Sequence, residues 1–471
     1  MPRLQPHPDR ILPSDPSLRA IAREIYQSVK DLPIVSPHGH VPGDWLADDQ
    51  PFADPTSLLI TPDHYVNRLL HANGVALSQL GVGQAGFTPE QSREAFGLLC
   101  RHWSVLRGTP MRFWFESELA DIFGIDLEPS PETADAIYDA IAAALATPEF
   151  RPRALYHRFR IELLATTDDP CDDLAAHARL AADPSWTGKV VPTFRPDRYL
   201  ESATPQWNDL VDRLGEASGH DTGSYAGWVA AMENRRGYFK QHGAISADHS
   251  HRDARAEPLE PTEAERLYAL ARAGRITPDE ADTLRRAFMF EQARMAADDG
   301  LVMTLHPAVY RNHHTSTFET YGADVGCDIP MAVEFTNALQ PMLAAFGTSA
   351  NFQLVPFTID ETVYSRELAP LAGFYPSVFV GVPWWFIDAP EAMARFRGAV
   401  TETIGFTRTS GFIDDTRAYL SIPARHDLSR RVDSGYLAKL VGDHRLSVDE
   451  ALESAHELVV GNPRRAFKLN A

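Results

Sequence analysis

Two histidines near the start of the chain and a carboxylate pair near its end are the residues best suited to chemistry. His38 and His40 end an apolar run and are separated by Gly39, which lets the backbone approach whatever they bind. In an extended segment, residues two apart leave the backbone on the same face. Asp414 and Asp415 end another strand-like run. Two imidazoles and one carboxylate can hold a divalent metal with positions left open for substrate.

The His-x-His motif alone is weak, because short motifs arise often by chance. Its simplest explanation is a pair of partly exposed histidines that cap loops at a strand end. The metal-site interpretation requires a fold that brings the two ends of the chain together.

Recurring apolar runs predict such a fold. Each run is short and is followed by polar residues and a helix-like stretch, which is typical of a parallel sheet covered on both faces. Eight such units predict an α/β protein with a closed (β/α)8 TIM-type barrel. The runs are Ile34–His38, Ile161–Thr167, Lys189–Phe194, Ala244–Asp248, Leu301–His306, Phe352–Phe357, Ser377–Val382 and Arg408–Asp414.

The segment between the first two runs has helix signals and no clear strand. Thr61-Pro62-Asp63 reads as a helix start, with proline at the first position and an acid in the first turn. We therefore expect residues 44–158 to form an all-helical insertion that roofs the active site. Residues 1–32 are expected to form an N-terminal arm and helix, and residues 33–43 and 159–471 the barrel.

Composition limits the partners. The 471 residues include 44 Lys and Arg against 64 Asp and Glu, a formal net charge of −20, which argues against nucleic acid. An anionic substrate would need local cations. Cys100, Cys171 and Cys327 are isolated, as expected in a reducing compartment. No apolar stretch resembles a signal peptide or a membrane span, so we expect a soluble cytoplasmic protein.

In such a barrel the active site lies at the carboxyl ends of the strands, and most of the predicted ends carry chemically able groups. The groups are His38, His40, Asp168, Asp169, Arg195, Asp197, Asp248, His306, Arg311, Trp384, Asp414, Asp415 and Arg417. Each also has a structural explanation: the Asp168-Asp169 pair can start a turn, Arg195 can form an ion pair, and the others can be core groups. Four further histidines are expected to be solvated loop residues, namely His249, His251, His313 and His314.

Taken together, these motifs resemble those of uronate isomerases (glucuronate isomerases), members of the metal-dependent amidohydrolase superfamily. The matching pieces occur in the family's order and span nearly the whole chain. They are His38-Gly39-His40, Asp63-His64-Tyr65, Ala165-Thr166-Thr167-Asp168-Asp169-Pro170, Arg195-Pro196-Asp197, Ser246-Ala247-Asp248-His249, His306, Arg311-Asn312, Trp384-Trp385-Phe386 and Asp415-Thr416-Arg417.

The resemblance implies a role for each site residue. His38, His40 and Asp415 correspond to the metal ligands. The catalytic residues are His64, Tyr65, Asp415 and Arg417, and the substrate-binding residues are Arg195, Asp248, His306, Arg311 and Trp384. The superfamily's binuclear members carry a bridging lysine on the fourth strand. Ile245-Ser246-Ala247-Asp248 has none, so the resemblance implies one divalent ion, with zinc the first choice and manganese or iron as alternatives.

The implied reaction is the aldose–ketose isomerisation of D-glucuronate to D-fructuronate, with D-galacturonate to D-tagaturonate as a second candidate. In our hypothesis Tyr65 moves the C2 proton, with its own proton held by a neighbour such as Arg417 or by a metal-bound water. His64 is a candidate acid, and Asp415 can also accept the ring hydroxyl proton. Arg195 and Arg311 would bind the substrate carboxylate, since arginine suits bidentate geometry.

Other functions stay open at this point. A metal-dependent hydrolase or decarboxylase acting on a small carboxylate could use the same barrel. A non-haem iron oxygenase and a non-catalytic relative are further alternatives. Ser36-Pro37 and Gly39 depart from the family pattern of Asp-Tyr before the first histidine and Cys between the two. These departures leave the substrate preference open, and the proline-rich arm suggests a contact in a homo-oligomer.

Overall fold

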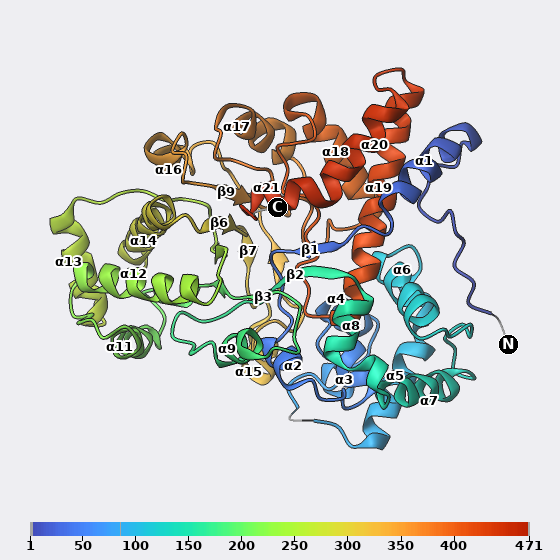
Figure 1. Cartoon of the computed structure of the whole chain (residues 1–471). Helices are drawn as coiled ribbons and strands as arrows, with labels where there is room; N and C mark the ends of the chain where they lie inside the picture. Colours follow the sequence, from blue (N-terminus) through green and yellow to red (C-terminus); the bar gives the residue numbers. More distant parts are fainter. Residues whose placement is uncertain (1–2, 85, 470–471) are drawn as a thin grey trace.

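Parallel strands form the centre of the structure, a computed structural model that describes residues 3–84 and 86–469. β1 pairs with β2 and β2 with β3; β4, β5, β6 and β9 pair in that order, all in parallel (Figure 1). These strands are β1 (Ile34–Ser36), β2 (Ile161–Ala165), β3 (Val190–Val191), β4 (Thr193–Phe194), β5 (Ser246–His249), β6 (Val302–Leu305) and β9 (Leu354–Pro356).

Single bridges complete the sequence of runs. Three isolated parallel bridges connect neighbouring runs: Asp168 pairs with Phe194, Leu354 with Val378, and Val380 with Thr409. The backbone N–H of His40 then donates to the carbonyl of Thr416 (3.0 Å), which ties the last run to the first. The predicted (β/α)8 barrel is therefore confirmed. It explains how His38 and Asp415 meet, since the first and last units of a closed barrel are neighbours.

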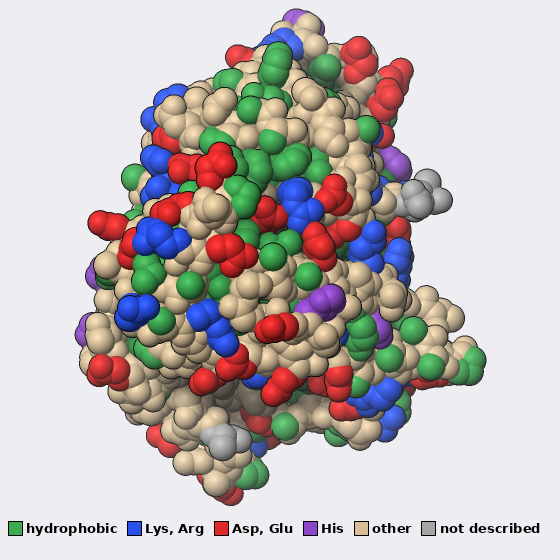
Figure 2. All heavy atoms as spheres, turned by 90° about the vertical axis from the view of Figure 1, so that its left-hand side faces the viewer, with side chains coloured by type: hydrophobic (Ala, Val, Ile, Leu, Met, Phe, Trp, Pro, Cys, Tyr) green, Lys and Arg blue, Asp and Glu red, His purple; other side chains and the backbone are tan. Residues whose placement is uncertain are grey.

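Helices surround the barrel. α11–α14 lie together on one side, whereas α16–α21 cover another (Figure 1). The helices that follow β2 are α9 (Ala175–Ala182), α10 (Asp197–Leu200), α11 (Trp207–Ser218), α12 (Tyr225–Gln241), α13 (Pro261–Arg272), α14 (Pro278–Asp299), α16 (Gln340–Phe346), α17 (Ala369–Phe374), α18 (Pro390–Ile404), α19 (Ile422–Gly442), α20 (Val448–His456) and α21 (Asn462–Ala466). On the α11–α14 side, acidic, basic and hydrophobic side chains are interspersed over the surface (Figure 2).

The segment after β1 is helical, as predicted. Its helices are α2 (Gly43–Asp48), α3 (Pro55–Leu59), α4 (His64–Ala72), α5 (Pro89–Arg101), α6 (Pro110–Ser117), α7 (Ala134–Leu145) and α8 (Pro152–Arg158). Asp63 caps α4, because its carboxylate accepts from the backbone N–H of Tyr65 (2.9 Å), which fixes the first turn that carries His64 and Tyr65. The domain boundaries themselves stay a prediction, and residues 1, 2, 85, 470 and 471 within them lie outside the described part.

Short 3₁₀ and π turns link several of these elements. They are η1 (Leu77–Leu80), η2 (Trp103–Leu106), η3 (Glu118–Ile122), η4 (Pro148–Phe150), η5 (Tyr364–Leu368), η6 (Tyr419–Ser421) and η7 (Glu457–Gly461). Within the described ranges, no helix combines the length and apolarity that a membrane crossing requires.

The N-terminal arm packs on its own chain. The N–H of Leu4 donates to the carbonyl of Asp126 (2.7 Å), and the Leu4 side chain is buried. The helix after the arm, α1 (Pro16–Val29), buries Ile25 and Val29 against Leu437 of α19 and its neighbours. The arm therefore has an intramolecular role, and the subunit contact suggested by its sequence stays a prediction.

A small flap follows β6. Its two strands, β7 (Val309–Tyr310) and β8 (Ile329–Pro330), pair in an antiparallel hairpin that encloses α15 (Thr315–Tyr321). The sequence did not predict this hairpin. It carries Asp324 and Asp328 to the mouth of the site described next.

Candidate active site

One cavity at the carboxyl ends of the barrel strands collects the predicted site residues. Its volume is about 290 Å³, and its wall includes residues of the barrel, the insertion and the flap. All residues to which the family resemblance gave a role line it: His38, His40, His64, Tyr65, Arg195, Asp248, His306, Arg311, Trp384, Asp415 and Arg417. Four other strand-end candidates are not part of its lining, namely Asp168, Asp169, Asp197 and Asp414. The structure also adds flap and insertion residues that sequence reasoning missed or treated as structural, among them Asp63, Asp324 and Asp328.

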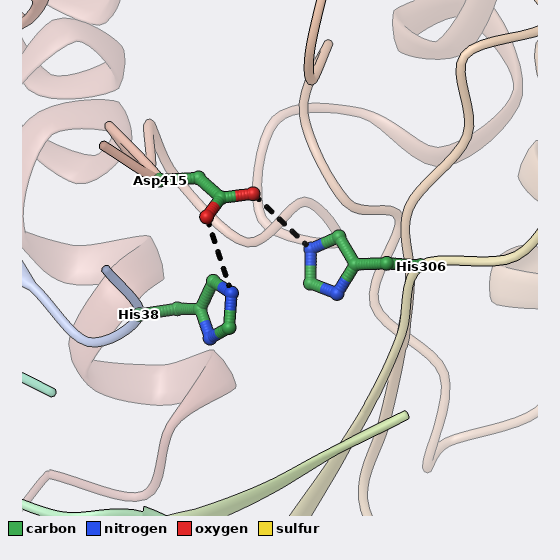
Figure 3. A group of neighbouring side chains, drawn as sticks. All are labelled: His38, His306 and Asp415. Atoms are coloured by element: carbon green, nitrogen blue, oxygen red, sulfur yellow. Dashed lines mark ion pairs between the residues drawn. The ribbon is translucent and has the colours of Figure 1, made fainter. Parts of the chain in front are cut away.

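Histidines and Asp415 form a compact group in this cavity. Asp415 Oδ1 lies 2.9 Å from His40 Nε2 and 3.3 Å from His38 Nε2, and Asp415 Oδ2 lies 3.8 Å from His306 Nε2. One carboxylate thus sits between imidazoles that come from opposite sides (Figure 3). His38, His306 and Asp415 offer ligand atoms within 4.8 Å of one another, so the group could hold a metal ion.

The contacts of this group suit a metal site. Asp415 Oδ1 and His306 Nε2 are buried, and neither has a hydrogen-bond partner among the described residues. Burial alone would raise the pKa of Asp415, but His38 and His40 hold that pKa well below its usual value. A buried, ionised carboxylate that faces unpartnered imidazole nitrogens is the donor set that divalent transition metals prefer. The predicted set of His38, His40 and Asp415 lies together, and His306 is a neighbour that the sequence had placed with the substrate.

His306 is oriented by a second carboxylate. Asp248 Oδ1 lies 2.6 Å from His306 Nδ1 and accepts a hydrogen bond from the hydroxyl of Thr304 (2.7 Å). The other oxygen of Asp248 lies 3.5 Å from Arg195 Nε. A carboxylate that binds Nδ1 leaves Nε2 available on the side of Asp415, which is the usual orientation of metal-facing histidines. Asp248 thus contacts both His306 and Arg195, and its role in substrate binding stays a prediction.

Tyr65 has a buried partner that the sequence did not reveal. Its hydroxyl donates to the carboxylate of Asp388, whose two oxygens both lie at 2.9 Å. Arg425 Nη1 donates to Asp388 Oδ2 (3.0 Å), and its guanidinium lies over the rings of Tyr65 and Trp114. The Tyr65 hydroxyl thus donates to Asp388, a neighbour that the sequence hypothesis of Arg417 or a metal-bound water did not name. Burial, followed by the Asp388 charge, raises the pKa of Tyr65 well above its usual value, so the phenol is protonated at neutral pH.

His64 is neutral in the same wall. Burial lowers the pKa of His64 to about 3, and the nearby charge of Arg417 contributes in the same direction. A neutral imidazole can donate an N–H hydrogen bond, but it lacks the acidic proton of an imidazolium ion. The acid role of His64 stays a prediction, and a neutral His64 could also act as a hydrogen-bond donor.

Carboxylates of the flap hold two of the cavity's arginines. Arg311 donates to Asp328 (2.9 Å) and to Ser250 Oγ (2.9 Å), and Arg417 lies 3.4 Å from Asp324. Arg311 Nη1 is also within 3.8 Å of Asp324. The arginines predicted to bind an anionic substrate therefore line the cavity, but each already contacts a carboxylate, as Arg195 does with Asp197 (2.9 Å).

Two backbone features around the site were not predictable from sequence. Asp415, Trp385 and Phe386 have positive φ angles of 39°, 21° and 67°, in a region that non-glycine residues rarely adopt. Such conformations cluster at functional sites, where surrounding structure holds them in place. At Gly39, by contrast, an added Cβ would meet its nearest atoms at 3.5–3.7 Å. The close backbone approach expected there does not depend on glycine.

Four histidines were predicted to be solvated loop residues, and the prediction was correct for two of them and wrong for the other two. His313 and His314 are exposed as expected. His249 and His251 are buried, with exposed fractions of 1% and 5%. β5 extends through His249, and the segment after it folds back so that His251 Nδ1 meets Glu201 (2.6 Å). Polar residues in a loop are buried when a neighbouring carboxylate satisfies them.

Comparison with known proteins agrees with this geometry. A family model described as glucuronate isomerase matches residues 17–467. A uronate isomerase of Cutibacterium acnes is 57% identical over 99% of both chains, and one of Corynebacterium efficiens is 51% identical over 98% of both. The crystal structure of glucuronate isomerase from Caulobacter crescentus is 45% identical, superposes with a TM-score of 0.97, and covers 100% of this chain and 98% of its own.

The chain belongs to the glucuronate isomerase family. As a uronate isomerase it is an enzyme, and the cavity that collects the histidines, Tyr65 and the arginines is its candidate active site. The resemblance stated from the sequence motifs is thereby confirmed. The individual roles of the site residues stay predictions.

Glu118 gives this uronate isomerase a pH-dependent stability. Burial raises the pKa of Glu118 to about 8, with Asp63 adding to the effect and Arg425 opposing it. This pKa exceeds the value of about 4.5 in the unfolded chain. The contribution of protonated Glu118 to the free energy of unfolding is therefore complete below about pH 4.5 and is lost as pH rises through about 8. The free energy of unfolding of the parent should therefore fall relative to that of Glu118→Gln, by about 2 kcal/mol as pH rises from 6 to 8. The measurement is the melting temperature of both proteins at each pH.

The control for this prediction is Glu94→Gln, which replaces an exposed glutamate of α5. It should melt in parallel with the parent at all pH values. If Glu118→Gln also follows the parent from pH 6 to 8, the buried Glu118 does not carry the predicted proton.

Proposed function

We propose that the enzyme converts D-glucuronate to D-fructuronate by aldose–ketose isomerisation, and that D-galacturonate is its second substrate. A buried group able to hold a metal, the Tyr65 hydroxyl and three arginines line one cavity, and this observation carries the proposal. The cavity volume of about 290 Å³ suits a small sugar acid.

The proposed cofactor is one divalent metal ion, with zinc as the first choice. His38, His40 and Asp415 would hold it, and His306 lies within reach. When bound, such an ion acts as a Lewis acid that polarises sugar oxygens and stabilises the negative charge of an enediol-type transition state. The unpartnered ligand atoms of Asp415 and His306 support this assignment.

Tyr65 and Asp388 are proposed to carry the proton between C2 and C1. The C2–H bond breaks as the proton passes to the phenol oxygen, while the phenol proton moves along the 2.9 Å hydrogen bond to Asp388. Burial raises the pKa of Asp388, which makes it a better acceptor than an ordinary carboxylate. Reversal of the same shifts delivers the proton to C1. The hydroxyl proton of the C2 oxygen passes to the C1 oxygen, which leaves a ketone at C2 and a hydroxyl group at C1.

The other residues are proposed to orient and release the substrate. His64, as a neutral imidazole, donates an N–H to a sugar oxygen. Asp415 accepts the hydroxyl proton when the cyclic sugar opens, and Trp384 packs beside His306, with ring centroids 4.6 Å apart. Arg417 lies beside these groups and binds the developing oxyanion.

Arg311 is proposed to bind the substrate carboxylate together with Arg195. We expect Arg311→Met to raise the KM for D-glucuronate by about 10–100-fold, because a charge-assisted hydrogen-bond pair contributes about 1.5–3 kcal/mol. Arg311→Lys, which keeps the charge but not the planar fork, should recover part of the loss. Competitive inhibition by D-glucose, which lacks the carboxylate, should change little in Arg311→Met. Equal losses for the charged and neutral sugars would contradict this assignment.

The function itself is tested by steady-state kinetics on both uronates. The metal-loaded enzyme is expected to produce a keto acid from D-glucuronate and from D-galacturonate, with kcat/KM values that establish its preference. The competing hydrolase or decarboxylase would instead give a product with added water or released carbon dioxide. Detection of either product, without a keto isomer, would contradict the proposal.

A further inference from the structure

A second, larger cavity lies at the opposite end of β1 from the catalytic residues. Its volume is about 630 Å³, and it is bounded by the N-terminal arm, the α1–β1 turn, the α6–η3 segment and α19. Ile34, the first residue of β1, lines this cavity, whereas His38 and His40 beyond the end of β1 line the active site. The two cavities share no lining residue.

Basic side chains dominate the charged wall of this cavity. Its lysines and arginines are Arg10, Lys30, Arg158, Arg160, Arg430 and Arg431, and its carboxylates are Asp31, Asp121 and Asp427. Six cations against three carboxylates leave an excess of three positive charges, in a chain whose formal net charge is −20. Such a concentration of positive charge in a concave site attracts anions.

The three carboxylates are each engaged by one cation. The pairs are Arg431–Asp427 at 2.7 Å, Arg10–Asp121 at 3.5 Å and Arg160–Asp31 at 3.1 Å. Within the described residues, Lys30, Arg158 and Arg430 have no carboxylate at ion-pair distance. Arg158 donates to the carbonyls of Asp121 and Ile122, which are uncharged acceptors. The excess charge is therefore not compensated by the protein.

Arg430 is the most informative of these cations. It is only 6% exposed, and its terminal nitrogens donate to the carbonyls of Lys30, Leu32 and Pro33 at 2.7–3.0 Å. Its Nε is buried without a hydrogen-bond partner anywhere in residues 3–84 or 86–469. Arg397 and Arg425 are also buried and each meets a carboxylate, whereas Arg235, which is 6% exposed, donates only to carbonyls of the described residues. Burial without a carboxylate partner lowers the pKa of Arg430 to about 10.

In the part of the chain that the structure describes, a second buried donor without an acceptor belongs to Arg10, whose guanidinium lies over the ring of Phe113. Arg10 Nη1 is buried and, in the described structure, finds no hydrogen-bond acceptor, while its Nη2 donates to Ser117 Oγ (2.8 Å). Arg10 belongs to the arm and Arg430 to α19, so the free donors come from segments at opposite ends of the chain. Lys30, which is exposed at the end of α1, lines the same cavity.

We propose that this cavity binds a small anion with at least two negative charges, a phosphate ester or a polycarboxylate. Guanidinium groups bind both through charge-assisted hydrogen bonds, and a multivalent anion would balance the positive charge that Lys30, Arg158 and Arg430 leave uncompensated. The bound anion links the arm to α19, where Arg431 already donates to the carbonyls of Pro8 and Arg10. The anion therefore stabilises the packing of the N-terminal arm on α19. A uronate carries only one negative charge, so this cavity binds it more weakly than a multivalent anion.

The test uses the metal-loaded full-length enzyme with inorganic phosphate or tricarballylate, at constant ionic strength. Binding is measured by isothermal titration calorimetry and by the shift in melting temperature, since a ligand of the folded state raises that temperature. Lys30→Glu, which changes an exposed residue, is expected to weaken binding of either anion about tenfold. Lys189→Glu changes an exposed lysine that does not line the cavity, and it should bind like the parent.

Anion binding to the active-site arginines is separated by Arg311→Met, which should keep the phosphate affinity of this second cavity. If Arg311→Met binds phosphate but not tricarballylate, the ligand class is phosphate esters. If it binds tricarballylate but not phosphate, the ligand class is polycarboxylates. Equal affinity of Lys30→Glu and Lys189→Glu would overturn the proposal. So would loss of all anion binding in Arg311→Met, or no binding by the parent.

Discussion

Replacing Tyr65 with phenylalanine is expected to lower kcat by about 10²–10⁴, the usual contribution of a positioned proton-transfer group. The change removes only the hydroxyl that donates to Asp388, and the ring can still pack against Trp114 and Phe386. Metal content should equal that of the parent, because the hydroxyl that is removed donates to Asp388 and is not one of the proposed ligand atoms, two of which are shown in Figure 3. The measurement is kcat on D-glucuronate together with metal content by mass spectrometry.

Tyr138→Phe is the matched control for this prediction. Tyr138 is a buried tyrosine of α7 in the same insertion, and its hydroxyl contacts Ser92 (3.0 Å) away from the cavity. It should retain the parent kcat. Asp388→Asn should follow Tyr65→Phe in direction, because it removes the acceptor of the phenol proton. A Tyr65→Phe enzyme with near-normal turnover would exclude the phenol from the mechanism.

Replacing His38 with alanine is expected to remove the metal and lower kcat by about 10³ or more, since Lewis-acid stabilisation contributes several kcal/mol. His38 is 1% exposed and its Nε2 lies 3.3 Å from Asp415 Oδ1, so the change removes one proposed ligand atom from a buried group. The measurements are metal content after dialysis and kcat on D-glucuronate. The loss of metal is a readout that does not depend on activity.

His313→Ala is the control for this change. It replaces an exposed histidine of the flap and should leave both metal content and kcat unchanged. A His38→Ala enzyme that binds one metal per chain and turns over normally would show that this group does not hold the cofactor.

The barrel and most of its site could be predicted because both depend on local patterns. Short apolar runs alternate with helices, and residues such as Arg195 and His306 directly follow them. A parallel barrel places every residue that follows a strand at the same end, so sequence position nearly determines location there. The meeting of His38 and Asp415, at opposite ends of the chain, follows from closure alone.

The missed residues depend on tertiary contacts that have no sequence pattern. Asp324 and Asp328 reach the site through a hairpin whose two strands have two residues each, too short for an alternating signal. Arg425 lies in α19, a helix buried on several faces, so its periodicity did not indicate which side faces Tyr65. Asp388 follows Trp385 and Phe386 through a left-handed backbone that sequence rules do not predict for aromatic residues.

The most direct test of the proposed mechanism is a proton NMR time course of the metal-loaded enzyme with D-glucuronate in deuterated water. Transfer by one hydrogen-bonded pair, Tyr65 and Asp388, predicts D-fructuronate in which C1 gains a single hydrogen at one of its two positions, as protium from C2 or as deuterium. Labelling of both C1 positions would contradict transfer by a single positioned group. Absence of any keto isomer from either D-glucuronate or D-galacturonate would contradict the account as a whole.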